Sequence, residues 1–217
     1  MDLTVFSPSS ALLTVVLLAL APFAAVMVTS FTKIVVVLSL LRNALGVQQV
    51  PPNLVLNGLA MVLTVYIMYP TALLMLDRVS GLDDFTSSTD NMIEAANLAK
   101  EPLRDFLIKH SEVREREFFL TSIKKMLTDD RQSEISSNDL VVLIPAFTIS
   151  ELTSAFQIGF LIFLPFIVID LVIANILMAM GMMMLSPTIV SLPFKLLLFV
   201  LVEGWTKLAH GLVISYL

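Results

Sequence analysis

Hydrophobic and polar positions divide this chain into an apolar, a polar and a second apolar block. No residue from Leu3 to Thr32 is charged, and a second uncharged run extends from Asn43 to Leu76. The apolar pattern resumes at Leu140 and continues to the C-terminus. A bilayer core of roughly 30 Å needs about 20 apolar helical residues. The two apolar blocks therefore predict membrane-spanning helices.

The first apolar block predicts a helical hairpin. Its first element, to Leu41, exceeds one straight span, so we expect it to kink near Pro22, to tilt, or to bury part of its length in protein. A short polar connector, 42–53, ends in a proline pair, and a second span starts at about Leu54 and is interrupted at Pro70. Short connectors of this kind join antiparallel helices.

The polar block, residues 77–139, predicts a soluble helical insert. Apolar positions from Leu103 to Met126 recur at a spacing closer to 3.6 than to 2. A shorter helix is expected around 94–100, with Pro102 in the first turn of the helix that follows. The four-residue spacing of Glu112 and Arg116 is typical of a solvated helix face.

The second apolar block predicts two more spans, 149–180 and 192–217, joined by a turn from Gly181 to Pro187. Four spans would put both termini and the insert on one side of the membrane. The opposite connectors carry Arg42 and Lys195 and no acid. Because basic residues favour the cytoplasmic side, we expect the connectors in the cytoplasm and the insert outside it.

Composition sharpens this division. The chain is 57% hydrophobic and only 14% charged, and 23 of its 31 charged residues lie between Asp77 and Asp139. We therefore divide it into an N-terminal hairpin (1–76), a charged insert (77–139) and a C-terminal hairpin (140–217). The acid at Asp2 and the long apolar run favour a retained membrane helix over a cleavable signal. The net charge of −5 arises in the insert and does not support nucleic-acid binding.

Catalytic and metal-binding patterns are missing from the sequence. The chain has no cysteine, and its two histidines are far apart, so neither a metal nor a cofactor is expected. It has no metalloprotease, phosphate-loop or nucleophile-elbow motif. Asp170 has no second intramembrane aspartate to pair with, as an aspartyl protease would require. We expect no enzymatic activity.

Among the charged residues within apolar segments, we single out Lys33, Glu151 and Asp170 as candidates for buried or inter-subunit charges. Such charges cost a few kcal/mol each in a membrane. They either pair, within the bundle or between subunits, and only hold it together, or they serve transport. A small secondary transporter that uses these charges for coupling is the alternative function that they leave open.

The turn between the last two spans is rich in methionine. Five of the twelve methionines lie within residues 178–184, including the consecutive Met182, Met183 and Met184. Methionine adapts to irregular contacts and often only fills gaps in a core. Three in a row cannot share one helix face, however, and the flanking Gly181 and Pro187 predict a loop. An exposed apolar loop is typical of a contact surface.

Several segments together resemble one known family. They are RNALGVQQVPPN at 42–53, PAFTISEL at 145–152, AFQIGF at 155–160, LPFIVIDLV at 164–172 and MGMMMLSP at 180–187. These resemble the R subunit of the type III secretion export gate, whose flagellar counterpart is FliP. The resemblance covers both apolar blocks and is weakest across 78–138. The short N-terminus and the FKLLLF segment at 194–199 favour the injectisome branch.

The resemblance implies an assembly rather than a single-chain function. About five copies would form a ring or helical cone with S-type and T-type subunits, within the bacterial inner membrane and projecting into the periplasm. It would pass unfolded effector and needle proteins, with energy from partners such as an ATPase and the proton-motive force. Its further partners would be other export apparatus components and needle and inner rod proteins. The family's methionine gasket corresponds to Met182, Met183 and Met184, and its SEL acid corresponds to Glu151, which is expected at a subunit interface.

Overall fold

A computed structural model describes residues 15–16, 19–20, 22–23, 25–47, 49–80, 89–128, 132, 135–182 and 184–217, with only the backbone for 89–96. All regular elements in these ranges are helices, which confirms the all-α class. They are α2 (Phe31–Leu45), α3 (Asn53–Ser80), α4 (Thr89–His110), α5 (Val113–Met126), α7 (Leu140–Ala179), α8 (Pro187–Leu201) and α9 (Gly204–Ile214).

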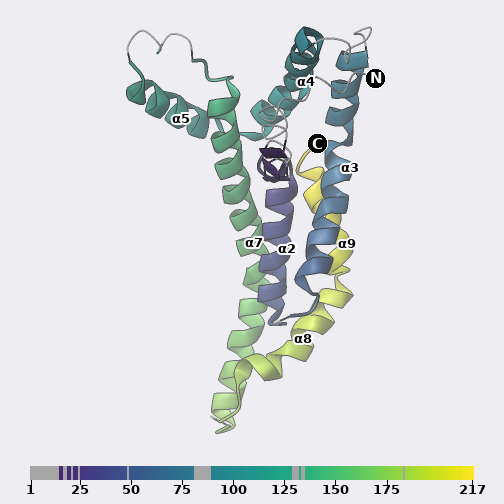
Figure 1. The fold of residues 1–217 in the computed structure, drawn as a ribbon. Helices are drawn as coiled ribbons and strands as arrows, with labels where there is room; N and C mark the ends of the chain where they lie inside the picture. Colours follow the sequence, from purple (N-terminus) through teal and green to yellow (C-terminus); the bar gives the residue numbers. More distant parts are fainter. Residues whose placement is uncertain are drawn as a thin grey trace.

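Helix α2 is the central element of the bundle. It lies between α7 on one side and α3 with α9 on the other (Figure 1). Its apolar residues contact all of these neighbours, and Ile34, Val37 and Leu38 are essentially inaccessible to solvent. We expected the long first element to kink, to tilt or to bury part of its length in protein. Helix α2, which is the last part of that element, is buried in protein.

The described residues of the N-terminal region contain a helix break after Pro22. The described residues from Ala25 to Met27 are helical, Val28 to Ser30 form a turn, and α2 starts at Phe31. Most of the expected span from Leu3 to Thr32 lies outside the described residues. Within them, Val28 to Ser30 interrupt the helix before α2, so it does not continue unbroken to Leu41.

Two described helices, α3 and α7, are long and apolar enough to cross a membrane. The bent pair α8 and α9 would form a third crossing if it acts as one span. Pro70 lies inside α3, and Pro145 and Pro165 lie inside α7, so these helices continue through their prolines. Neighbouring helices can compensate for the lost backbone hydrogen bond when a proline lies within a membrane helix.

The expected final span, 192–217, is not one continuous helix but is broken near its middle. Helix α8 ends at Leu201. The break consists of Val202 and Glu203, and α9 then runs at an angle of 59° to α8. Glu203 has a positive φ of 54°, a left-handed conformation that is costly for a residue with a side chain. A Cβ on Gly204 would lie 2.1 Å from the ring of Phe199, so only glycine fits there. The break depends on this packing.

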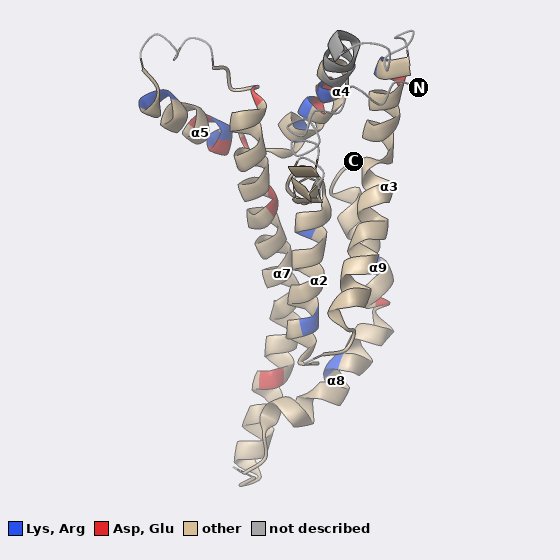
Figure 2. Cartoon of the chain, viewed as in Figure 1, with Lys and Arg blue, Asp and Glu red and all other residues tan. Residues whose placement is uncertain are grey.

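In the described part of the charged insert, α4 and α5 meet at a different point from the one expected. Pro102 lies inside α4 rather than at the start of the second helix, and the chain breaks at Ser111 and Glu112. The Ser150 hydroxyl of α7 accepts a hydrogen bond from the Glu112 N–H at 2.9 Å, which fixes this break to the bundle. Charged residues concentrate on α4 and α5 and are sparse along the other helices (Figure 2).

Candidate functional site

The methionine-rich turn lies at the far end of the α7–α8 hairpin, away from α4 and α5 (Figure 1). Helix α7 ends in a Schellman motif, in which the Met182 N–H donates to the Leu177 carbonyl at 2.9 Å and the Gly181 N–H donates to the Met178 carbonyl at 3.0 Å. Gly181 has a φ of +74°, the left-handed conformation that this motif requires. Pro187 is the first residue of α8, where its fixed φ and missing N–H suit a helix start.

Methionine side chains at this turn are open to solvent in the single chain. Met184 is fully exposed and Met182 is 43% exposed, and the following Leu185 is also exposed. Met183 lies outside the described residues. The turn therefore presents an apolar tip supported by two long helices, which is unfavourable in water without a partner or lipid.

Lys33 and Glu151, which the sequence singled out separately, form one buried ion pair. The Lys33 ammonium lies 2.9 Å from a Glu151 carboxylate oxygen, and their side chains are 5% and 2% exposed. Tyr216 completes the cluster, because its hydroxyl donates to the other Glu151 oxygen and its ring lies under the Lys33 ammonium, 4.1 Å from ring centre to Nζ. The cluster joins α2, α7 and the residues after α9, and one chain supplies all of its members.

Asp170 pairs with a different residue, Lys195 of α8. The Lys195 ammonium lies 2.6 Å from Asp170 Oδ2, and the Ser191 hydroxyl donates to Asp170 Oδ1 at 2.5 Å. Lys195 also donates to the Ala44 carbonyl at 3.3 Å. That carbonyl belongs to the last turn of α2, where carbonyls lack helical partners and a cation is favourable. This second cluster ties α2, α7 and α8 together near the connector.

Lys195 and Tyr216 are the partners that the sequence analysis missed. Lys195 carried a signal, since Asp170 and Lys195 lie on opposite sides of the turn, 14 and 11 residues from its central Met184 and so within one helical turn of equal spacing. In an antiparallel hairpin, residues at equal distances from the turn face each other. Tyr216 carried no comparable signal, because its contact with Glu151 depends on the bend between α8 and α9.

His110 lies beside the first cluster, at the end of α4. Its ring packs against Phe106 and Tyr216, with ring centres 4.7 and 5.0 Å apart. Burial, followed by the positive charges of Lys109 and Lys33, lowers the pKa of His110 from 6.5 to about 4. The imidazole is therefore neutral at pH 7. Within the described part of the chain, no group of three side chains is arranged to hold a metal ion.

Sequence comparisons assign the chain to a family. The FliP family profile matches residues 12–212. The chain is 50% identical to the hypersensitivity response secretion protein HrcR of Ralstonia nicotianae over 210 residues, which cover 96% of this chain and 97% of that protein. It is 52% identical to the Yop proteins translocation protein R of Yersinia pestis over 200 residues, 92% of each chain. The flagellar biosynthetic protein FliP of Bacillus subtilis is 44% identical over 206 residues, which cover 94% of this chain and 90% of that protein. The chain belongs to the FliP family.

Proposed function

We propose that this protein is a core subunit of a type III secretion export gate in the bacterial inner membrane. About five copies, with S-type and T-type subunits, enclose a path for unfolded effector, needle and inner rod proteins. The chain performs no chemistry of its own. Its near full-length similarity to a secretion protein and a translocation protein supports this role.

The observation that carries the proposal is the exposed methionine-rich tip. Side chains without branches or fixed shape can close against one another and still adapt to varied passing sequences. Met182, Met183 and Met184 from several copies would form an apolar gasket that excludes ions at rest. The Schellman motif at Gly181 and the helix start at Pro187 would hold each tip in place.

Exposed apolar surface along α7 supports assembly. Phe156, Phe160, Leu161 and Leu164 are all exposed in the single chain. A face of this extent on a long helix requires cover from lipid or from neighbouring subunits. In the proposed gate, neighbouring subunits cover part of it and membrane lipid covers the remainder.

The alternative of a small secondary transporter receives less support. Coupling charges must exchange partners with a substrate or with water during a cycle. Lys33 and Glu151 instead neutralise each other in a nearly inaccessible cluster, and Asp170 is held by Lys195 and Ser191. These arrangements favour a role in holding helices together.

Crosslinking to a stalled substrate tests the proposal. A photo-crosslinking residue replaces Met184, and a secreted protein carrying a tightly folded C-terminal domain is trapped during export in intact cells. Met126 on α5, which is also highly exposed, is the matched control position. We expect substrate crosslinks from position 184 and not from position 126. Equal crosslinking at both positions, or none at position 184 in an assembled complex, would contradict the proposal.

A further inference from the structure

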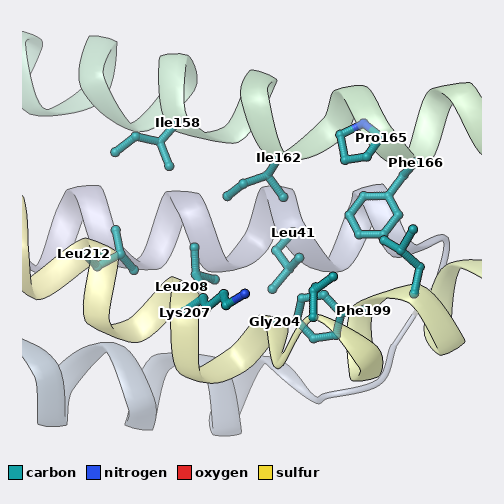
Figure 3. A pocket seen from close by; sticks show the side chains of 13 residues that line it. Leu41, Ile158, Ile162, Pro165, Phe166, Phe199, Gly204, Lys207, Leu208 and Leu212 are labelled. Carbon is teal, nitrogen blue, oxygen red and sulfur yellow. The ribbon is translucent and has the colours of Figure 1, made fainter.

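A cavity of about 440 Å³ lies beside the α8–α9 break, between α2, α7 and α9 (Figure 3). Its walls are almost entirely aliphatic and aromatic, with Leu41 of α2, Ile162 and Phe166 of α7, and Leu208 of α9 among them. This size and character are typical of a site for a small apolar ligand. Water gains few hydrogen bonds in a cavity of this kind.

One cation accompanies this apolar lining. Lys207 of α9 extends along the cavity in Figure 3, with its ammonium toward Gly204 and Leu41. No ion pair joins the Lys207 side chain to any of the residues that the structure describes, and Glu203, one turn earlier, forms none either. Lys207 differs in this respect from Lys33 and Lys195, which both have carboxylate partners. Lys207 is exposed, so its ammonium at the cavity is accessible to an anionic group from outside the chain.

We propose that this cavity binds an anionic phospholipid. An acyl chain occupies the apolar space, and the headgroup phosphate pairs with Lys207. Basic positions between membrane helices are known to select such headgroups. This inference goes beyond the proposed export function and does not rest on it.

The mouth of the cavity favours lipid over a polar ligand. Val202 lines the cavity and is itself exposed, and the adjacent Leu201 is 73% exposed. The cavity is therefore continuous with an apolar outer surface of the α8–α9 pair, which is long and apolar enough for a crossing if it acts as one span. An acyl chain can enter from the bilayer without crossing a polar barrier.

Two glycines supply a matched pair of variants. Gly211 lines the cavity, and a Cβ built there meets no atom within 4 Å, so Gly211→Leu fills the cavity without a clash at Cβ. Gly58 of α3 is equally free of neighbours but is not part of the lining, so Gly58→Leu adds the same side chain elsewhere. Lys207→Gln removes the cation, with Lys124→Gln on α5 as its control.

The chain's single tryptophan reports binding. Trp205 packs edge-on against Phe199, which lines the cavity, with ring centres 5.4 Å apart. The full chain is reconstituted in phosphatidylcholine vesicles. Increasing amounts of a brominated lipid, either phosphatidylglycerol or phosphatidylcholine, are included in these vesicles. Quenching of Trp205 fluorescence then measures occupancy of the site by each lipid.

We expect saturable quenching with an apparent preference of about fivefold for phosphatidylglycerol, the effect of about 1 kcal/mol per basic residue. Lys207→Gln removes the preference, and Gly211→Leu lowers the quenching by both lipids. The two control variants behave as the parent chain does. Equal quenching by both lipids in the parent chain, or quenching unaffected by Gly211→Leu, overturns the proposal. Loss of all quenching when partner subunits are added also overturns it, because a protein segment then occupies the cavity.

Discussion

Lys195 on α8 and Asp170 on α7 hold the two arms of the methionine-tipped hairpin together, with 2.6 Å between Nζ and Oδ2. Lys195 is buried and Asp170 is 30% exposed, so the pair lies at the edge of the bundle. Through the Ala44 carbonyl, the same ammonium fixes the end of α2. Lys195 therefore adds polar contacts to the apolar packing that positions the hairpin against the central helix.

Removing the lysine alone should destabilise the hairpin. Lys195→Met leaves Asp170 with only Ser191 as a hydrogen-bond donor, and we expect a loss of about 1–3 kcal/mol. This lies below the 3–5 kcal/mol typical of a fully buried pair, because Asp170 is partly solvated. Unfolding by denaturant in detergent micelles measures the loss. The double variant Lys195→Met/Asp170→Asn should recover part of it, and a double variant as unstable as the sum of both single variants would contradict a direct pairing.

The buried Lys33–Glu151 pair should be more sensitive. Lys33→Met leaves a carboxylate that is almost inaccessible to water without its cation, and we expect a loss of about 3–5 kcal/mol. Tyr216→Phe removes only one hydrogen bond to the same carboxylate and should cost about 1.5–3 kcal/mol. Unfolding by denaturant in detergent micelles measures the loss in both variants. If Tyr216→Phe proved more damaging than Lys33→Met, the ion pair would not be the main contribution of this cluster.

Acid should destabilise the region around His110. Its folded-state pKa of about 4 lies below the 6.5 of an unfolded chain, so between these values the unfolded state binds more protons. The contribution to stability is fully present above about pH 6.5 and is lost as the pH falls toward about 4. His110→Phe retains an aromatic ring and cannot titrate. The difference in unfolding free energy between parent and variant should therefore fall over this range, and a pH-independent difference would contradict the burial of His110.

The break between α8 and α9 should tolerate no side chain at Gly204. Gly204→Ala places a methyl group 2.1 Å from the Phe199 ring and should lower the melting temperature of the purified protein. Gly211→Ala within α9 meets open space and should raise stability by about 0.5–1 kcal/mol, as is usual for this change inside a helix. Similar effects of the two variants would indicate that Phe199 does not pack on Gly204.

Local sequence patterns predicted the two longest helices of this fold, although α7 starts nine residues before the expected span of 149–180. The uncharged run after Asn53 produced α3, and the run after Leu140 produced α7, because sustained apolar composition determines long membrane helices. Prolines misled the prediction of breaks, since Pro102 lies within α4 while the chain breaks at Ser111, where Ser150 accepts the Glu112 N–H. Long-range packing determined those breaks.

The candidate site was predictable in some of its residues, but Tyr216 and the pairings were not. The turn at Gly181 followed from glycine and proline positions, which carry local backbone information. The partner of Asp170 depended on the hairpin alignment, and the contact of Tyr216 with Glu151 depended on the α8–α9 bend. The spacing of Asp170 and Lys195 about the turn pointed to their pairing once a hairpin was assumed, but no local pattern pointed to the contact between Tyr216 and Glu151.

Ion conductance through the assembled gate tests the central claim most directly. The complex with the triple change Met182→Ala, Met183→Ala and Met184→Ala is compared in planar bilayers with the parent complex and with a complex carrying Met126→Ala. The account predicts intact assembly and a clear rise in resting conductance for the triple variant alone. An assembled triple variant with unchanged conductance would contradict the methionine gasket.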